Sequence, residues 1–420
     1  MSSPPSGGRG SDATTRRAFL ARTAGASLAL SGAGALLAAC GGSSTSSTTS
    51  RAASTIQLAS PENPVTWPLT AKPIASGLAP ERNATLRIYN WDAYLSPQVI
   101  KNFCQKYQCK SEVTTFETMT EAIEKLSTGQ VQADLFFPRI DNLAQAIQGK
   151  LIQPLNHTYV TNYDALWPGL RNPFYDVGWH YTVPYAVYTT GITWRKDHIA
   201  PANDPTRLGY ATPWQGQYKG KVALIDDYRE GLVLGLIKNG IYNFNTSDPA
   251  QINKAKNSLI ELTGLVDVHV DESDYTNVPS GQIWIHQAFS GDMAAAAAYM
   301  PKGVSVDVIG YWFPSDNRGP VGNDTVAIPT SATNPVLAHL FINELLQLNT
   351  ALENTSYIGY MQPIQGVTPQ RLISEKIIPA ALASTTVLPA QLDQGIRELQ
   401  LSATTNALWE QAWQEFTHGI

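Results

Sequence analysis

The chain from residue 86 onward alternates between short apolar runs and segments that have one apolar helical face. Residues 86–89 predict a strand, and residues 97–106 predict a helix with apolar side chains at helical spacing. Ser96 is a good N-cap for this helix, and Pro97 suits its first position because the N–H that proline lacks would have no partner there. The alternation continues with predicted strands at 111–116, 134–138 and 151–155 and predicted helices at 120–127 and 143–147. This order is typical of a mostly parallel sheet covered by helices.

The second half of the chain repeats this order. A long β-branched and aromatic run at residues 181–194 predicts a strand that leaves a first lobe and enters a second. A strand at 221–225 ends before Asp226 and Asp227, which fill the turn before a helix, and residues 324–329 would cross back to the first lobe. Further strands are predicted at 282–286 and 307–310, and further helices at 293–298, 336–346 and 409–416. Two α/β lobes joined by extended crossings predict a clamshell that binds a ligand between the lobes and closes by a hinge motion.

The composition adds one broad preference. The 420-residue chain is 43% hydrophobic and 15% charged, which is ordinary for a globular protein with enough core for two domains. Its net charge of −5 excludes the strongly basic character of nucleic-acid-binding proteins. Residues 1–39 hold four Arg and one Asp, so the remainder carries 25 Lys and Arg against 33 Asp and Glu, a formal charge of −8. An acidic body favours cationic ligands in a general way.

The N-terminus has the features of an export signal. Residues 15–20, Thr-Arg-Arg-Ala-Phe-Leu, are typical of a twin-arginine signal, and the apolar stretch at 24–39 is too short and too rich in small residues to span a membrane. It ends in Leu-Ala-Ala-Cys40, which resembles a bacterial lipobox, where the cysteine is lipidated and becomes the new N-terminus. We therefore expect residues 1–39 to be removed and Cys40 to anchor the protein on the outer face of the cytoplasmic membrane. The alternative is a plain signal peptide with a chance cysteine.

Residues 40–84 are expected to be the lipidated cysteine and a flexible linker. Residues 41–54 are rich in Gly, Ser and Thr and have no hydrophobic pattern, as in a tether, while the proline-containing stretch at 56–80 permits no assignment. Two further cysteines, Cys104 and Cys109, lie near the end of the first helix. Because an exported protein meets oxidising conditions, we expect them to form a local disulfide; the alternative is two free thiols on one amphipathic segment.

The motifs of common enzyme classes are absent from the sequence. There is no G-x-S-x-G elbow, no P-loop, no G-x-G-x-x-G after a strand and no H-E-x-x-H. The seven histidines are scattered singly, and no Cys/His spacing indicates a metal site. We therefore predict neither an enzyme nor a resident metal or cofactor.

Several residues are candidates for ligand contact because of where they lie in the predicted elements. Trp91 and Tyr94 follow the first strand, and open α/β sheets bind ligands at the carboxyl ends of their strands. The alternative is that both rings cap a core. Asp227 and Glu230 have an alternative role as a helix cap and a first-turn acid, and Trp284 has an alternative role as a core residue.

Short blocks along the chain carry a family resemblance. The blocks are Tyr89–Tyr94, Asp134–Pro138, Val183–Tyr185, Asp226–Glu230, Gln282–Trp284, Asp324–Pro329 and Tyr357–Tyr360. In this order and spacing they are similar to the spermidine/putrescine-binding proteins of bacterial ABC importers, from about Leu86 to the C-terminus. The resemblance implies a two-lobe periplasmic-binding-protein fold of type II, without catalysis. The expected lobes are residues 85–190 with about 325–358, and residues 191–324 with about 359–420.

The resemblance also implies a site and partners. Family members hold a polyamine in the inter-lobe cleft and deliver it to a membrane permease and its ATPase, and we expect a monomer that binds no nucleic acid. The residues that would face the ligand are Trp91, Tyr94, Asp227, Glu230, Trp284, Asp324 and Tyr360. A polyamine suits such residues, because each CH₂ buried against a ring contributes about 0.8 kcal/mol, an ammonium over a ring about 0.5–2 kcal/mol, and carboxylates bind the charged ends.

The chain departs from the polyamine-binding pattern at a few positions. Arg139 and Asp141 stand where the family usually shows a small hydroxyl residue and an aromatic, Asp92 replaces a small polar residue, and Gly322 replaces a second stacking Trp. Arg139 either pairs with Asp141 or Asp92 and leaves the cleft acidic, or binds a ligand carboxylate in a bidentate fork. The second arrangement would mean an amino-acid-like, guanidino or other zwitterionic or cationic ligand.

Overall fold

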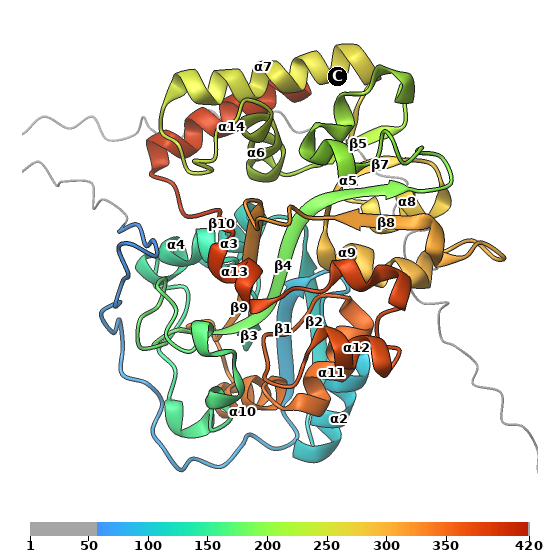
Figure 1. Ribbon diagram of the computed structural model, residues 1–420. Coiled ribbons are helices and arrows are strands. Elements are labelled where there is room, and N and C mark those ends of the chain that lie inside the picture. The colour runs from blue at the N-terminus through green and yellow to red at the C-terminus, as the bar shows by residue number, and fades with distance from the viewer. Residues whose placement is uncertain (1–56, 419–420) are drawn as a thin grey trace, which may run out of the picture. The chain divides into compact units, whose positions relative to one another are not determined.

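The computed structural model in Figure 1 describes residues 57–418. The expectations for the twin-arginine signal, for lipidation of Cys40 and for the tether before residue 57 concern the chain outside these residues. Within them, none of the helices combines the length and the apolar character that are needed to cross a bilayer.

The described part of the chain forms a mixed α/β structure around one sheet. The strands are β1 (Thr85–Trp91), β2 (Lys110–Phe116), β3 (Leu135–Phe136), β4 (Thr182–Arg195), β5 (Val222–Ile225), β6 (His269–Asp271), β7 (Ile285–Phe289), β8 (Ile309–Trp312), β9 (Pro320–Ala327) and β10 (Ile396–Arg397). The sheet order is β2-β1-β3-β9-β4-β7-β5-β6, with β10 paired to β9 and β8 paired to β4. The pairs β1·β2, β1·β3, β5·β6 and β5·β7 are parallel, and the pairs of β4 with β9, β7 and β8 are antiparallel.

Helices cover this curled sheet, as the sequence predicts (Figure 1). They are α2 (Pro97–Tyr107), α3 (Met119–Ser127), α4 (Leu143–Gln148), α5 (Pro205–Leu208), α6 (Tyr228–Lys238), α7 (Pro249–Val266), α8 (Asp274–Ser280), α9 (Ser290–Ala295), α10 (Pro335–Leu345), α11 (Leu348–Ile358), α12 (Pro369–Ser374), α13 (Pro389–Gln394) and α14 (Ala403–Thr417). The Ser96 side chain accepts from Gln98 N at the start of α2, which confirms the predicted cap. Most of the predicted alternation of strands and helices is thus confirmed, but residues 151–155 form no strand and contribute only an isolated bridge between Ile152 and Pro329.

Strand β4 joins the two halves of the sheet. All of its 14 residues are buried, as its β-branched and aromatic sequence predicts. Its first part pairs with β9 up to Thr189, and its second part pairs with β7 from Thr190 onward. The ladder on one side of β4 therefore ends at the residue before the one where the ladder on its other side begins. The register with β9 shifts between Pro184 and Ala186, because proline has no N–H to donate to the ladder.

One large hydrophobic cluster spans both halves of the sheet. It buries Ile88, Phe103 and Phe341 of the first half together with Ala288 and Tyr311 of the second. In the second half, α6, α7 and α14 pack on one another and bury Leu232 and Trp409. The C-terminal helix therefore covers the second half of the sheet, and Figure 1 shows it beside α6 and α7.

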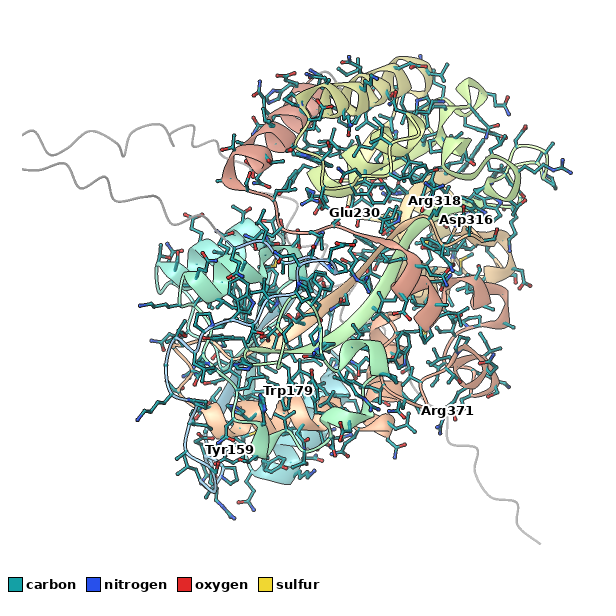
Figure 2. All side chains as sticks on the ribbon, turned by 60° about the vertical axis from the view of Figure 1, so that its left-hand side comes forward. Tyr159, Trp179, Glu230, Asp316, Arg318 and Arg371 are labelled. Atoms are coloured by element: carbon teal, nitrogen blue, oxygen red, sulfur yellow. The ribbon has the colours of Figure 1, made fainter. Side chains whose placement is uncertain are left out.

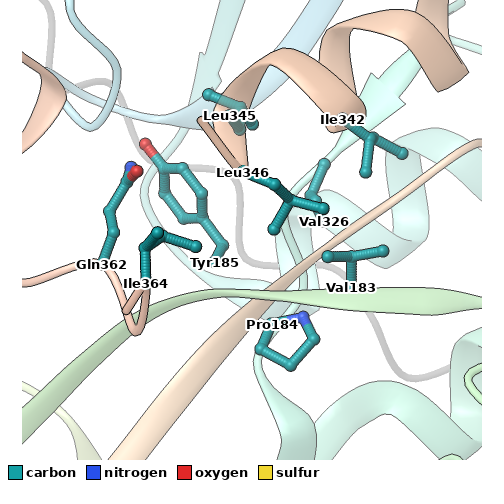
Figure 3. A pocket seen from close by; sticks show the side chains of 9 residues that line it. All are labelled: Val183, Pro184, Tyr185, Val326, Ile342, Leu345, Leu346, Gln362 and Ile364. Carbon is teal, nitrogen blue, oxygen red and sulfur yellow. The ribbon is translucent and has the colours of Figure 1, made fainter. Parts of the chain in front are cut away.

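A small apolar cavity lies next to the first part of β4 (Figure 3). Val183, Tyr185 and Leu346 are among the side chains that line it, and Gln362 is its polar member. The Tyr185 hydroxyl donates to Tyr94 O and accepts from Asn354 Nδ2 at 2.8 Å. The cavity is thus a space within the core, with hydrogen-bonded Tyr185 as one of its walls.

Two further expectations are corrected by the fold. Residues 57–84, which were expected to belong to a flexible linker, lie against the body and bury Val65 and Trp67. The strand expected at 282–286 begins three residues later, at Ile285, and runs to Phe289.

The disulfide between Cys104 and Cys109 stays a prediction. Both side chains are free thiols in the structure, and their sulfur atoms lie 2.7 Å apart. In air-oxidised protein we expect both cysteines to resist alkylation until a reductant is added. Closing so short a loop stabilises the fold by about 2 kcal/mol, so reduction lowers the melting temperature, whereas Cys104→Ser is insensitive to reductant. Thiol alkylation read by mass spectrometry measures this, and full alkylation of the unreduced protein would contradict it.

Candidate functional site

Polar and aromatic side chains gather where several strands end. Arg139 follows β3 as the N-cap residue of the short 3₁₀ helix Ile140–Asn142, which contains Asp141. Asp227 caps α6 after β5, and Glu398 follows β10. Strands β3 and β5 lie in different halves of the sheet and run in opposite directions, so their carboxyl ends point toward each other and the segments that follow them meet here.

Arg139 is the centre of this group. Its Nη1 donates to Asp227 Oδ2 at 3.0 Å, its Nη2 donates to Glu398 Oε2 at 3.1 Å, and its Nε lies 3.3 Å from Asp141 Oδ1. The guanidinium side chain is 12% exposed. Burial opposes its charge, but Asp141, Tyr188, Asp227 and Glu398 outweigh this effect and raise the pKa of Arg139 well above its usual value. One cation thus joins three carboxylates from three separate segments.

Three carboxylates of the group keep an oxygen without a hydrogen-bond partner among residues 57–418. Glu230 is 2% exposed; its Oε1 accepts from Thr190 Oγ1 at 3.1 Å, and its Oε2 has no donor. Asp324 Oδ2 accepts from the Tyr94 hydroxyl at 2.8 Å, while its Oδ1 and Glu398 Oε1 have no donor. A buried acceptor without a donor costs about 1–3 kcal/mol, and more when it is charged. A ligand that carries N–H donors would remove this cost.

Burial changes the acidity of these carboxyl groups. It raises the pKa of Asp324 to about 6, although Arg139 opposes the shift, and that of Glu398 to about 7, although Arg229 and Arg139 oppose it. The pKa of Glu230 is raised well above its usual value by burial and by the neighbouring Glu398. Burial therefore favours the protonated forms of these groups, and an approaching cation favours their charged forms.

Tyrosine rings and one phenylalanine form the apolar wall of the site. Tyr360 lies edge to face with Tyr94, with ring centroids 5.0 Å apart, and Tyr188 contacts Tyr360 at 6.1 Å and Phe289 at 5.3 Å. Tyr188 also lies within the electrostatic influence of Arg139: burial raises the pKa of its hydroxyl, and the nearby guanidinium opposes this shift. Such faces suit an ammonium group and its methylenes.

Gly322 is required by this wall. Tyr188 and Gly322 are partners in the β4·β9 ladder, and a Cβ at Gly322 would lie 2.4 Å from the Tyr188 ring. At the position where Gly322 replaces a second stacking Trp, the ring of Tyr188 from the neighbouring strand lies across the glycine.

A second acidic group adjoins Tyr360. The Tyr360 hydroxyl donates to Asp292 Oδ2 at 2.9 Å, and Asp274 is 3% exposed with an Oδ2 that has no donor among the described residues. Burial and the neighbouring Asp292 and Glu272 raise the pKa of Asp274 well above its usual value. The pKa of Glu272 is raised to about 8 by desolvation and by Asp227, an effect that solvent moderates because Glu272 is exposed. Within residues 57–418, no group of three or more His, Cys, Asp or Glu is placed to hold a metal ion.

Most of the residues predicted from sequence meet in this site. They are Tyr94, Arg139, Asp141, Asp227, Glu230, Asp324 and Tyr360. Trp91 lies close by, since its Nε1 donates to Phe137 O at 3.1 Å, but its ring packs on Phe116. Asp92 is exposed and is not one of the carboxylates that pair with Arg139. Glu230, labelled in Figure 2, lies in the interior near the middle of the molecule.

The position of Trp284 does not fit the prediction that it faces the ligand. It precedes β7, at the amino end of that strand, where its ring stacks on His198 at 4.3 Å and its Nε1 donates to Gly281 O at 3.1 Å. The aromatic residue at the carboxyl end of β7 is Phe289. The predicted strand ended at residue 286, three residues before the observed end of β7 at Phe289. Phe289 was therefore not recognised as a candidate, and Trp284 was chosen in its place. Tyr188 and Glu398 were also missed, because nothing near them in the sequence marks a strand end or a turn.

The fold and this site define an α/β protein of the type II periplasmic-binding class. The chain belongs to the family of bacterial extracellular solute-binding proteins, which it matches over residues 98–380. It is similar to the spermidine/putrescine-binding periplasmic protein of Escherichia coli, at 28% identity over 313 residues that cover 74% of this chain and 86% of that protein. The fold is also that of a spermidine/putrescine substrate-binding protein from Streptococcus pneumoniae, with a TM-score of 0.66, 22% identity and coverage of 80% and 99%. A binding protein from Agrobacterium tumefaciens in complex with agropinic acid aligns with a TM-score of 0.56, 20% identity and coverage of 81% and 99%.

The raised pKa of Glu398 gives a test by unfolding. The folded protein holds more protons on this group than the unfolded chain does, so its contribution to stability falls as the pH rises from about 4.3 to about 7. We therefore expect Glu398→Gln to gain roughly 1–3 kcal/mol relative to the wild type between pH 5 and pH 8, since glutamine does not titrate. Burial lowers the pKa values of His157 and His339, so their contribution to stability increases as the pH rises. This contribution is the same in the wild type and in Glu398→Gln, so it cancels in the comparison.

Urea unfolding at a series of pH values measures this difference. Glu375→Gln, a substitution at an exposed residue after α12, is the control and is expected to follow the wild type. A Glu398→Gln profile parallel to that of the wild type would contradict the assignment.

Proposed function

We propose that this protein is the extracytoplasmic substrate-binding component of an ABC importer, and that it binds a polyamine such as spermidine or putrescine between its lobes. It passes the ligand unchanged to a membrane permease with its ATPase, and it works as a monomer held by a lipid on Cys40. The observation that carries the proposal is the set of buried carboxylate oxygens without donors on Glu230, Asp324 and Glu398, beside a wall of tyrosine rings.

The chemistry of this set favours an organic cation. An ammonium group has three N–H donors and no acceptor, so it supplies what the carboxylates lack. Methylene groups between ammonium ends would lie against Tyr94, Tyr188, Tyr360 and Phe289, where their burial is favourable. The similarity to spermidine/putrescine-binding proteins at modest identity supports the same class of ligand.

The second candidate is the same scaffold with a different cationic or zwitterionic ligand. The observation that favours it is that Arg139 already donates hydrogen bonds to Asp227 and Glu398, two carboxylates that would otherwise be available to a polyamine. The agropinic acid complex concerns a protein of this fold whose ligand is no polyamine. Against this candidate, all the nitrogen atoms of the Arg139 guanidinium lie near carboxylates of the chain, which leaves less of it for a ligand carboxylate.

A thermal-shift panel of polyamines, basic amino acids and guanidino compounds tests the proposal. We expect spermidine or putrescine to raise the melting temperature, because a ligand at 100 times its dissociation constant stabilises the folded state by about 2.7 kcal/mol. Glu230→Gln is expected to weaken binding about 10- to 100-fold, since it removes a charge-assisted hydrogen bond. Titration calorimetry gives the affinities, with Glu375→Gln as the control. No shift with any polyamine would refute the ligand class.

Arg139→Ser separates the two candidates. If Arg139 serves to hold the carboxylates together, its removal leaves three buried acids without their cation, so polyamine binding weakens about tenfold and the fold loses roughly 3–5 kcal/mol. Arg371→Ser is the control: its guanidinium pairs with Glu375, and Figure 2 shows it at the edge of the molecule, apart from Glu230. An Arg139→Ser variant that binds polyamines more tightly than the wild type would favour the second candidate.

A further inference from the structure

An N-terminal strap, defined as residues 57–82, runs along the first half of the molecule without forming a helix or strand. It is fixed by hydrogen bonds along its length. Val65 N donates to Phe174 O and Val177 N donates to Val65 O, both at 2.8 Å, and Thr70 N donates to the Tyr181 hydroxyl at 2.7 Å. The strap lies before residue 98, where the match to the solute-binding family begins. The strap therefore lies outside the matched residues and is held to the body by its own hydrogen bonds.

Trp67 connects the strap to the floor of the site. Its side chain is 3% exposed, and its Nε1 donates to Tyr175 O at 2.7 Å. The Tyr175 hydroxyl accepts from Asn323 Nδ2 at 2.8 Å, and Asn323 is the neighbour of Asp324 in β9. Two hydrogen bonds and one residue of strand thus separate Trp67 from a ligand-facing carboxylate.

The strap also lies behind the ion cluster of Arg139. Ala59 and Trp67 line a small cavity together with Ile140 and Leu399. Ile140 stands between Arg139 and Asp141 in the chain, and Leu399 follows Glu398 directly. Trp67 and Ile140 also belong to one cluster of buried apolar residues. The packing of Trp67 therefore supports both backbone segments that carry the cation and one of its acids.

We propose that Trp67 is a positioning residue: the strap holds the two segments that carry Arg139 and Glu398 at the separation that their ion pair requires. Loss of this support moves the guanidinium relative to Asp141 and Glu398 and changes the acidity of the cluster. The inference concerns this chain's own ion cluster, and it stands whichever small cation the site binds.

The first experiment needs no ligand. Trp67→Ala is compared with Leu69→Ala, a strap residue that is 51% exposed, by urea unfolding between pH 5 and pH 8. We expect Trp67→Ala to increase the pH dependence that Glu398 contributes by about half, since Arg139 opposes the raised pKa of Glu398 and its displacement lets that pKa rise further above its ordinary value. In a Glu398→Gln background, Trp67→Ala is expected to have no such effect, because the titrating group is gone.

The second experiment uses putrescine as the probe, with affinity measured by calorimetry. We expect about tenfold weaker binding for Trp67→Ala and wild-type affinity for Leu69→Ala. Trp67→Phe keeps most of the ring but has no N–H for Tyr175 O, so it recovers part of the loss. If Trp67→Ala does not fold, the comparison rests on Trp67→Phe, whose volume is closer to that of the wild type.

The outcomes separate the two proposals. A pH profile that is unchanged by both Trp67 substitutions, or a Trp67→Ala effect that persists in the Glu398→Gln background, overturns the positioning role. A wild-type protein that binds no putrescine refutes the polyamine proposal alone, because the pH measurement still decides the role of Trp67.

Discussion

The structure depends on one buried guanidinium. The positive charge of Arg139 offsets the electrostatic repulsion among Asp141, Asp227 and Glu398, which lie close together in the protein. The three acids come from segments that are remote in sequence. Their meeting point is therefore also the point at which the two halves of the sheet are tied to each other. An ion cluster of this kind fixes the relative positions of its side chains more than it stabilises the fold, since the desolvation of the charged groups offsets much of their Coulomb attraction.

The same cluster explains why the site combines acid and aromatic groups. A carboxylate between tyrosine rings is poorly solvated, so it attracts a cation more strongly than an exposed acid would. Tyr94 donates to Asp324 and Thr190 donates to Glu230, which fixes one oxygen of each carboxylate and leaves the other free. The direction in which each acid accepts a further donor is thus set by the protein before any ligand arrives.

Much of the fold and part of the site could be predicted from sequence. The strand and helix pattern, the cap at Ser96 and the long strand at 181–194 depend on local periodicity and turn chemistry, and the structure confirms them. Arg139 and Asp141 stood out because they depart from the pattern of a known family. Glu398 and Tyr188 could not be found in this way, because Glu398 acts through a side-chain contact with Arg139 and Tyr188 through strand pairing with Gly322, each across more than 100 residues. Trp284 shows the opposite error, where a conspicuous aromatic in an apolar run belongs to the packing at the wrong end of its strand.

The ladder between β4 and β9 ends at Thr189, and the ladder between β4 and β7, on the other side of β4, begins at Thr190, whose hydroxyl binds Glu230. Because neither ladder spans both residues, a rotation of one half of the sheet against the other would bend the backbone here. The backbone that bends and the side chain that anchors an acid of the site are consequently the same residue. Binding of a ligand at Glu230 and bending of β4 would then act on the same residue, so no longer chain of contacts is needed to couple them.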